Sequence, residues 1–456
     1  MFVLRFLYFL FALEHETFDS LKSDAINILI GEIKMKKTLA LILALCMVLA
    51  LCACGKTAAP AEEASDELVP TEYVPLEFDP LVSDPVPVSD LKIGVITLHD
   101  ENSSYDRNFI DAAKDVFSEL GVKDENFMLR TNIGEDETCY DAAAELADAG
   151  CNVIFSDSYG HEAYMIQAAK EFPTVNFVSA TGDRAHYEGI ANYHNAFASI
   201  YNGRYLAGVA AGMKLNDMIA NGEFKAEEAK IGYVGAKPYA EVISGYTSFF
   251  LGARSVCPTV TMEVIYTNSW YDEALEKEAA NNLIKNGCKL ISEHADSMGA
   301  PTACETAGVP NVSYNLSFMD ACPNTYLCGS RINWRPYFKV MVNALVDGKA
   351  IPTDFLGTLD DSGVEVLDLN TAIAAPGTAE KLAEVAKDLQ SGKLVVFDTS
   401  TFTVGGKAVT SYGADVINDG TFSHETQAIG NGEFNESLYR SAPYFDMIID
   451  GITVLG

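Results

Sequence analysis

The sequence predicts an α/β fold of two lobes, each a parallel sheet flanked by helices, joined by a hinge. Three observations predict this fold. Short apolar strands alternate with amphipathic stretches of about a dozen residues from Leu91 onward, which is typical of parallel strands with right-handed crossovers. The same rhythm restarts at Tyr201. The chain from Leu91 to Gly456 is also long enough for two domains of ordinary size.

The first lobe is predicted at residues 91–200, with residues 325–350 returning to it. Leu91–Leu98 (LKIGVITL) is expected to be a strand. Asn108–Leu120 carries apolar residues at helical spacing and stops at Gly121, a residue that favours helix ends. Glycine or proline bounds the next elements in the same way, and these are helix Asp136–Ala149, strand Cys151–Phe155, helix His161–Phe172 and strand Val175–Ser179.

The second lobe is predicted at residues 201–324 together with 351–456. Its first helix, Tyr201–Leu215, carries small residues at close-packing positions, namely Ala207, Gly208, Ala210, Ala211 and Gly212. Strands and helices then alternate as Lys230–Val234, Ala240–Ser255, Thr259–Thr267, Asp272–Asn286, Lys289–Glu293, Met298–Ala307 and Val312–Tyr314. The tail is predicted as helix Ala379–Gln390, strand Leu394–Asp398, a β-rich insert at Thr401–Gly432 and a closing helix at Ser437–Ile449.

The N-terminal region predicts export. Lys36 and Lys37 precede the apolar run Thr38–Leu51 and then Cys52-Ala53-Cys54, which is typical of a lipoprotein signal cut before the lipid-bearing cysteine. The run is shorter than the roughly 20 residues that span a bilayer. We therefore expect Cys54 to be lipidated and the protein to be anchored on the extracytoplasmic face of the cell membrane. Residues 1–53 are thus an upstream extension plus the signal peptide.

The signal is complete from Met35, so residues 1–34 are interpreted as an over-long translation start, with a genuine anchor as the alternative. Residues 54–90 are rich in Ala, Pro, Glu and Asp. Such a composition buries too little apolar surface to fold, so this stretch is expected to be a disordered, acidic, Pro-rich tether.

Charge and cysteine spacing exclude several kinds of partner. The net charge of −33 without a basic stripe argues against nucleic-acid binding. No C-x-x-C motif follows the signal and no histidine cluster accompanies the cysteines, so neither a metal nor another cofactor is predicted. Cys151 and Cys288 are expected to be buried thiols. Cys322 and Cys328 are close enough to form a disulfide, and the sequence leaves that pairing open.

Polar and aromatic residues follow the predicted strands. In open parallel sheets, ligands bind beyond the carboxyl ends of the strands. We therefore expect a flat, hydrogen-bonding ligand between two facing lobes. The residues expected at this site by their position after strands are Asp100, Tyr105, Ser158, Tyr159, Trp270, His294, Asp296 and Asn315. Asp100 has an alternative interpretation as a helix cap. Glu241 is interpreted as a carboxylate that caps its helix or lies in the first turn, where a negative charge is favourable.

Several ordered segments resemble the basic membrane lipoprotein family of solute-binding proteins, which includes purine nucleoside receptors. The segments are YNGRYLAGVAAG at 201–212, IGYVGAKPYAEVISGYTSFFLGAR at 231–254, SWYD at 269–272, ISEHADS at 291–297, Tyr314-Asn315 and NWRPYF at 333–338. The resemblance implies a periplasmic-binding-protein type I fold. It also implies a purine nucleoside or nucleobase ligand, delivered to an ABC permease.

In that family an aromatic residue from each lobe sandwiches the purine. The resemblance assigns these positions to Trp270 and Tyr105, although the usual phenylalanine–asparagine pair of the first lobe is absent. Asn315 stands where many members have a ribose-binding aspartate, and Trp334 follows Asn333 where many place a lysine. Packing between lobes is the alternative role for Trp270, and packing in a hinge-helix core is the alternative for Trp334.

The sequence thus predicts a monomeric, lipid-anchored binding protein without catalytic residues. It has no Gly-x-x-x-x-Gly-Lys-Ser/Thr motif, so ATP would be bound by a separate subunit. A surface nucleoside hydrolase is the enzymatic alternative, but Gly-x-Ser-x-Gly is absent. A ligand sensor, or a receptor for a sugar, a flavin or a peptide autoinducer, stays open.

Overall fold

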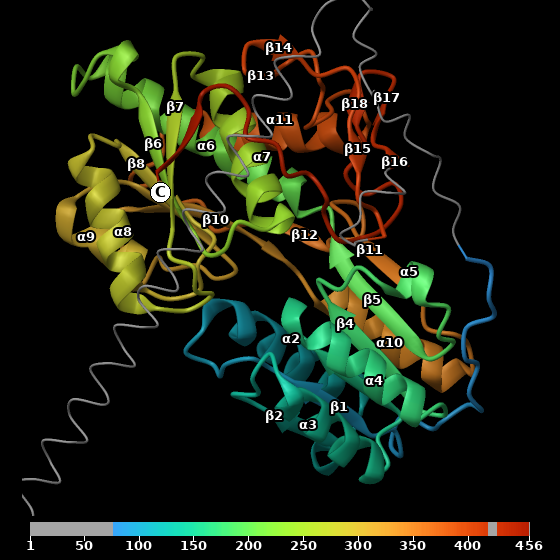
Figure 1. Ribbon diagram of the computed structural model, residues 1–456. Helices are drawn as coiled ribbons and strands as arrows, with labels where there is room; N and C mark the ends of the chain where they lie inside the picture. The colour runs from blue at the N-terminus through green and yellow to red at the C-terminus, as the bar shows by residue number, and fades with distance from the viewer. Residues whose placement is uncertain (1–75, 418–425, 456) are drawn as a thin grey trace, which may run out of the picture. The chain divides into compact units, whose positions relative to one another are not determined.

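The computed structural model of the protein describes residues 76–417 and 426–455 and contains two large sheets with helices on their faces (Figure 1). The predicted two-lobed α/β fold is confirmed. All strand pairs of the two sheets are parallel except β10 with β12, which is antiparallel.

The first sheet has the strand order β11-β5-β4-β3-β1-β2. The first part of the chain supplies β1 (Ile93–Ile96), α2 (Ser104–Leu120), β2 (Phe127–Arg130), α3 (Glu137–Asp148), β3 (Val153–Ser156), α4 (Glu162–Glu171), β4 (Asn176–Ala180), α5 (Ala185–Glu188) and β5 (Tyr193–Ala198). Helix α2 begins a turn earlier than predicted because the Ser103 side chain caps it, and it ends at Gly121 as expected. Strands β2 and β5 were not predicted.

The second sheet has the order β12-β10-β9-β8-β6-β7-β19. Its elements are α6 (Ile200–Ala220), β6 (Lys230–Gly235), α7 (Ala240–Val256), β7 (Thr261–Tyr266), α8 (Glu273–Lys285), β8 (Leu290–Glu293), α9 (Gly299–Ala307), β9 (Asn311–Tyr314), β10 (Tyr326–Ile332), β12 (Val364–Leu367), α11 (Thr378–Gln390) and β19 (Ile452–Leu455). Short 3-10 turns lie at Asp124–Asn126, Tyr159–His161 and Ala226–Glu228.

The lobe boundaries differ from the predicted ones in the returning segments. Strand β10 was expected in the first lobe but pairs with β9 and β12 of the second sheet. Helix α10 (Arg335–Asp347) packs against α2, and β11 (Asp354–Gly357) joins the first sheet beside β5, although it was expected in the second lobe. Sheet membership depends on hydrogen-bonded partners that lie far away in sequence, so the order of elements alone could not assign these two strands.

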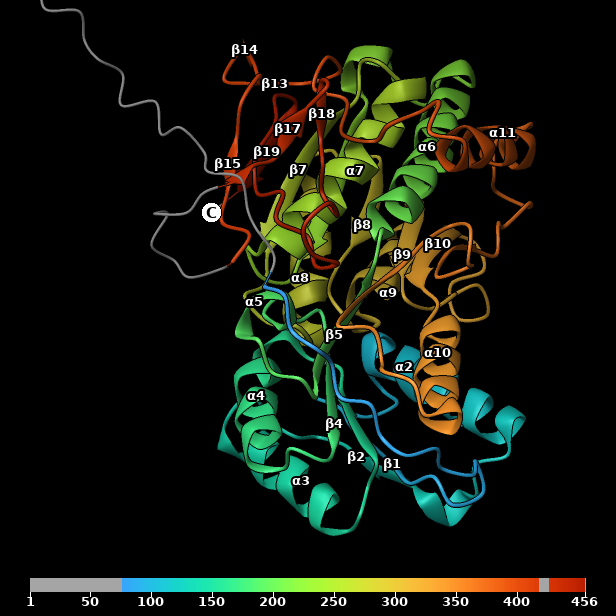
Figure 2. The same ribbon diagram turned by 90° about the vertical axis from the view of Figure 1, so that its right-hand side faces the viewer.

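Three chain crossings between the sheets form the hinge (Figure 2). The first joins β5 to α6, the second joins β10 to α10 and the third joins β11 to β12. Backbone hydrogen bonds tie them together: Ser199 donates to Gly357 O at 2.8 Å and Asn333 donates to Gly363 O at 2.9 Å. Asn333 also donates its side-chain amide to Ser362 O at 3.0 Å.

The tail differs from the prediction in two places. Leu394–Asp398 is not a strand, since only Asp398 forms an isolated bridge, although Val396 and Phe397 are buried in the second-lobe core. Ser437–Ile449 is not a helix, because Pro443 lacks an N–H group and the Glu436 carboxylate accepts the Phe445 N–H at 2.9 Å.

The insert at 401–432 is β-rich in its described part. It contains β13 (Thr403–Val404) paired with β14 (Lys407–Ala408) and β15 (Gly413–Ala414) paired with β16 (Thr426–Gln427). Its strand β17 (Ile429–Gly430) pairs with β18 (Glu433–Phe434), which lies just after the insert, and all three pairs are antiparallel.

The expected tether is shorter than predicted. The Leu81 N–H donates to Ala191 O at 2.6 Å and the Val86 N–H donates to Leu345 O at 3.1 Å. Val86 and Val88 pack against the first-lobe core. The chain from Leu81 onward is therefore bound to the first lobe, because these apolar side chains find a surface that composition alone does not reveal. Cys54 and the signal lie outside the described residues.

Helices α6 and α7 pack with unusually short separation. A Cβ on Gly252 would lie 2.0 Å from Tyr205 O, and one on Gly208 would lie 2.0 Å from Phe249 O. The predicted close-packing role of the small residues on α6 is thereby confirmed.

We expect Gly252→Ala to destabilise the protein. Its Cβ would meet backbone, which cannot move aside as a side chain can, so the free energy of unfolding should fall by about 1–3 kcal/mol. This loss should appear although alanine favours helix over glycine by about 1 kcal/mol. Urea denaturation measures the change. Ser255→Ala, at an exposed position on the same helix, should stay within about 0.5 kcal/mol of the parent protein, and an unchanged midpoint for Gly252→Ala would contradict the close approach.

Candidate functional site

A narrow, partly open cavity lies where the carboxyl ends of the two sheets face each other, and the empty space in and in front of it, open solvent included, is about 350 Å³. The first lobe lines it from the ends of β1, β3 and β4 and from the first turn of α2, with Leu98, Tyr105, Asp106, Ser158, Tyr159 and Thr181. The second lobe lines it from α7 and from the loops after β7 and β8, with Glu241, Trp270, His294 and Asp296.

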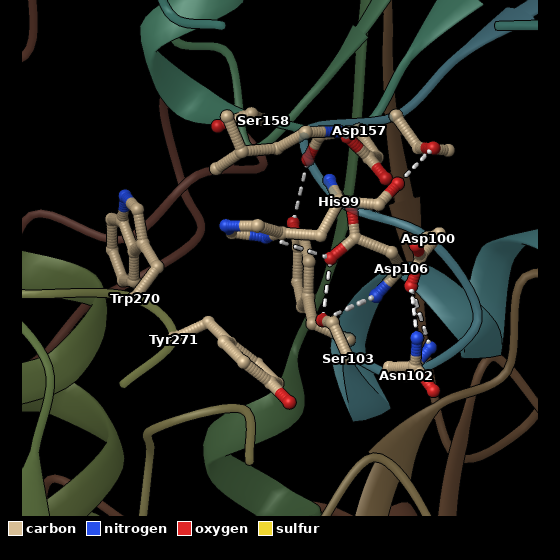
Figure 3. Close-up of polar contacts among 12 residues, drawn as sticks. His99, Asp100, Asn102, Ser103, Asp106, Asp157, Ser158, Trp270 and Tyr271 are labelled. Carbon is tan, nitrogen blue, oxygen red and sulfur yellow. Dashed lines mark hydrogen bonds and ion pairs between the residues drawn. The ribbon is translucent and has the colours of Figure 1, made fainter. Parts of the chain in front are cut away.

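Asp106 is a fully buried carboxylate on the first-lobe wall. It accepts hydrogen bonds from the His99 backbone N–H at 2.7 Å and from the Ser103 hydroxyl at 2.5 Å (Figure 3). The ring nitrogen Nδ1 of His99 also lies 3.3 Å from this carboxylate. Burial acts to raise the pKa of Asp106, but these hydrogen bonds and the nearby imidazole outweigh it and lower the pKa. Asp106 therefore holds a negative charge in the cavity wall.

Asp157 lies beside Asp106 and has the opposite electrostatic character. Its Oδ1 accepts the Leu98 N–H at 3.1 Å, and its backbone carbonyl accepts the Tyr105 hydroxyl at 2.8 Å. Burial, followed by repulsion from Asp106, raises the pKa of Asp157 well above its ordinary value. The hydrogen bond to the Asp157 carbonyl orients Tyr105 in the wall, where its ring lies 4.9 Å from that of Phe109.

Arg204, buried on α6, organises the second-lobe wall. Its guanidinium donates to Glu293 O at 3.0 Å and to His294 Nδ1 at 3.0 Å, and lies 3.4 Å from the centre of the Tyr314 ring. Because arginine can only donate, His294 Nδ1 must accept, which places the imidazole proton on Nε2. That nitrogen lies 3.5 Å from Glu241 Oε1.

His294 is held neutral by this arrangement. Burial lowers the pKa of His294, and the positive charge of Arg204 lowers it further against the opposing effect of Glu241. The imidazole can therefore donate one hydrogen bond toward Glu241 without carrying a charge itself.

Asp296 follows β8 and is 4% exposed. Among the described residues, its carboxylate has no hydrogen-bond partner, although its backbone carbonyl accepts the Ser104 N–H at 2.8 Å. Burial raises the pKa of Asp296 well above its ordinary value, and repulsion from Asp106 adds to the effect. The unused hydrogen-bonding capacity of this side chain is directed to the cavity that it lines.

Glu135, in the loop between β2 and α3, connects the two lobes. Its carboxylate accepts the Ser158 hydroxyl at 2.7 Å within the first lobe. From the second lobe it accepts the Trp270 indole N–H at 3.3 Å and lies 3.3 Å from Lys237 Nζ. We call Glu135, Ser158, Lys237 and Trp270 the Glu135 cluster. Burial opposes ionisation of Glu135, but the hydrogen bond from Ser158 and the charge of Lys237 lower its pKa.

Other contacts also join the lobes. The rings of Tyr159 and Tyr239 are 5.7 Å apart, and those of His99 and Tyr271 are 5.5 Å apart, with His99 pointing toward Trp270 and Tyr271 in Figure 3. Together with the Glu135 cluster, these contacts define a closed arrangement of the lobes.

A second, wider cavity adjoins the first, with about 940 Å³ of empty space when open solvent is included, and the two share Tyr159, Thr181 and Glu241. The C-terminal segment contributes Arg440, whose guanidinium lies 3.3 Å from the Asp183 carboxylate. Residues near the end of the chain thus extend the lined surface beyond the first cavity.

The structure brings six of the nine predicted site residues together. Tyr105, Ser158, Tyr159, Trp270, His294 and Asp296 all line the cavity. Trp270 and Tyr105 lie in opposite lobes, as the expected pair of rings requires.

The other three predicted site residues lie elsewhere. Asp100 accepts hydrogen bonds from Asn102 in the loop after β1. Trp334 is buried in the first-lobe core with its ring 4.3 Å from that of Phe109, so its alternative interpretation as a core residue fits its position. Asn315 is buried after β9 with a φ of 65°, and its side-chain amide nitrogen has no partner among the described residues.

Leu98, Asp106, Thr181 and Glu241 line the cavity but were not predicted as site residues. Asp106 lies inside a helix turn, where carboxylates are common for reasons unrelated to ligands. Glu241 was interpreted in that way. Thr181 follows β4 directly, so inspection of the residues after every strand would have found it.

The described chain offers little support for other kinds of site. Within residues 76–417 and 426–455, no group of three or more His, Cys, Asp or Glu residues is arranged to hold a metal ion. The seven cysteines of this part are buried and free, so the open Cys322–Cys328 pairing is not formed, and Cys151 and Cys288 are buried thiols as predicted. None of the helices described is both long and apolar enough to cross a membrane.

Comparison with known proteins places this geometry in a family. The family described as "ABC transporter substrate-binding protein PnrA-like" matches residues 95–349, more than half of the chain. The chain belongs to this family. Its members bind solutes for ABC transporters, so this PnrA-like protein has a small-molecule ligand and a permease partner, and it functions outside the cytoplasm.

Individual relatives agree with this placement. A purine-binding protein of Brucella abortus is 31% identical over 287 residues, covering 63% of this chain and 77% of that protein. A Haloferax volcanii protein named for glucose binding in an ABC transporter is 31% identical over 258 residues, covering 57% and 62% of the two chains. The solved structure of an ABC transporter solute-binding protein from Aeropyrum pernix shares the fold, with a TM-score of 0.57, 14% identity and coverage of 66% and 92%.

We expect Glu135→Gln to weaken closure of the lobes. The change keeps the size of the side chain but removes the charge that Lys237 and the indole N–H contact from the other lobe. Ligand affinity should fall about three- to tenfold, in line with the loss of a charge-assisted hydrogen bond that is partly exposed. Isothermal titration calorimetry measures the affinity, and small-angle scattering measures the closed fraction.

Glu145→Gln is the matched control, because Glu145 pairs with Arg130 at 2.8 Å within the first lobe alone. Since the pKa of Glu135 is lowered, the parent protein should keep this contribution at neutral pH and lose it only as the pH falls through that lowered pKa. Equal affinities for the two variants would show that Glu135 does not contribute to closure.

Proposed function

We propose that the protein binds a purine nucleoside or nucleobase between Trp270 and Tyr105 and delivers it to an ABC permease. The observation that carries this proposal is the cavity at the facing strand ends, lined by several carboxylates and by aromatic rings from both lobes, Tyr105 and Tyr159 from the first and Trp270 from the second. Aromatic faces stack on planar bases, and carboxylates accept hydrogen bonds from ring N–H, amino and hydroxyl groups. The similarity to a purine-binding protein over 77% of its length supports the same ligand class.

Binding is proposed to operate by closure. A ligand held by groups of both lobes binds the closed arrangement better than the open one and shifts the population toward it. The hinge supplies the movement through three short crossings, and the Glu135 cluster contributes contacts that exist only when the lobes meet. The permease would then distinguish the closed, loaded protein from the open one.

A sugar is the second candidate ligand. The glucose-binding name of the Haloferax volcanii relative favours it, and a carboxylate-rich cavity can accept hydrogen bonds from sugar hydroxyls as well. The presence of aromatic residues on both walls favours the purine, because a flat heterocycle can stack on two rings at once.

We expect Trp270→Ala to weaken purine nucleoside binding at least about fivefold, since one base–aromatic stack contributes roughly 1–3 kcal/mol. Adenosine, guanosine or inosine should raise the melting temperature of the parent protein, whereas glucose should leave it unchanged. Calorimetric titration then gives the affinities. Tyr140→Ala removes an aromatic residue of α3 that contacts Glu171 and does not line the cavity, so it should leave binding unchanged. If glucose raises the melting temperature and the nucleosides do not, the ligand is a sugar and the purine proposal is wrong.

The protein is also proposed to be a monomer, anchored through a lipid on Cys54 to the extracytoplasmic face of the membrane. The basic pair, the short apolar run and the small residues before Cys54 support this localisation. The tether between Cys54 and Leu81 would separate the folded lobes from the lipid surface.

We expect Cys54→Ser to release the protein from the membrane fraction, because the thiol that carries the lipid would be absent. Detergent phase partitioning and labelling with a fatty-acid probe would measure the change. Cys52→Ser, two residues upstream, should leave labelling unchanged. Retention of the fatty-acid label by Cys54→Ser would refute the assignment.

A further inference from the structure

The charge of the cavity wall is unbalanced. Its lining includes the carboxylates of Asp106, Glu241 and Asp296, and it includes neither lysine nor arginine. The only lining side chain with a basic nitrogen is His294, and Arg204 makes its Nδ1 an acceptor, so the imidazole is neutral. The cavity thus presents several acidic groups and no cationic group directly to a ligand.

The cations near the cavity are already committed to other partners. Arg440, in the adjoining cavity, lies 3.3 Å from the Asp183 carboxylate. Lys237 contacts Glu135 at 3.3 Å. Arg204 lies behind the wall, stacked on Tyr314 and bonded to Glu293 O and His294. Neither Lys237 nor Arg204 forms a hydrogen bond or an ion pair with the carboxylate of Asp296, and the charge of Arg204 acts on it only through space. This carboxylate has no hydrogen-bond partner among the described residues, although the residue is 96% buried.

The aromatic wall suits a positive charge as well. Lys237 Nζ, which is paired with Glu135, lies 4.9 Å from the centre of the Trp270 ring, so a positive charge is compatible with the face of this indole. A cationic heterocycle between Trp270 and Tyr105 would gain from the ring faces in the same way. A metal ion is a poorer occupant, because the described acidic groups are not arranged to coordinate one.

We propose that the preferred ligand is a heterocycle that carries a positive charge at neutral pH, and that Asp296 is the carboxylate that recognises this charge. The inference rests on the proposed function, because it specifies which purine nucleosides or related rings the cavity takes. Burial and repulsion from Asp106 disfavour the ionised form of the Asp296 carboxyl, so a neutral nucleoside meets it as a neutral hydrogen-bonding group. A ligand cation would stabilise the ionised form and make the contact a charge-assisted hydrogen bond.

Two isomers provide a direct test with the full mature protein. 1-Methyladenosine is a cation at neutral pH, whereas N6-methyladenosine has the same carbon, nitrogen and oxygen atoms and is neutral. Isothermal titration calorimetry should show that the cationic isomer binds at least about tenfold more tightly, because a charge-assisted hydrogen bond is roughly twice as strong as a neutral one. Asp296→Asn should reduce that preference at least about fivefold.

Asp111→Asn is the charge-matched control, since Asp111 is an exposed carboxylate on α2 that pairs with Arg107 and does not line the cavity. It should retain the preference of the parent protein. Circular dichroism and thermal unfolding would establish that both variants are folded. An unchanged preference in Asp296→Asn would refute the role of Asp296.

A second pair separates the charge preference from the purine proposal. 1-Methylnicotinamide is cationic and nicotinamide is neutral, and neither is a purine. If adenosine and both of its methylated forms fail to bind but 1-methylnicotinamide binds more tightly than nicotinamide, the purine proposal fails and the charge preference stands. If adenosine binds and the neutral member of each pair binds as tightly as the cationic one, the charge preference is overturned and the purine proposal stands. Failure of all these compounds to bind would overturn both.

Discussion

In a parallel sheet the chain leaves every strand at the same edge, the carboxyl end, and this constraint determines where the binding site can form. Each loop that follows a strand in a lobe begins at the same edge, so side chains far apart in sequence meet there. Because the chain crosses between the sheets three times, the two edges face each other across one hinge. The cavity, its aromatic walls and the Glu135 cluster all occupy the space that these edges share.

Burial then decides the protonation of the groups at these edges. Asp106 keeps its charge because His99 and Ser103 donate hydrogen bonds to it, whereas Asp157 beside it has no comparable set of donors and its pKa is raised. In the opposite wall, Arg204 makes His294 an acceptor at one nitrogen and a donor at the other. Neighbouring groups of similar chemistry therefore present different charges, as expected where solvent screening is weak.

The C-terminal segment adds features outside the residues matched by the PnrA-like family. Strand β19 extends the second sheet beside β7, and Arg440 pairs with Asp183 of the first lobe. That pair is nearly inaccessible to solvent, and opening of the lobes must change its environment if the segment moves with the second sheet. The end of the chain therefore contacts both lobes.

The sequence by itself determined the local elements and their alternation, because apolar periodicity, glycine stops and helix caps depend on near neighbours. It also determined which residues follow the strands, and six of its nine predicted site residues line the cavity. Tertiary structure decided the rest. Sheet membership of β10 and β11 depends on distant hydrogen-bond partners, and Trp334 stacks on Phe109 in a core that only folding assembles. The roles of Arg204, Glu135 and Asp296 likewise depend on burial and on groups brought together from separate elements, quantities that no stretch of sequence contains.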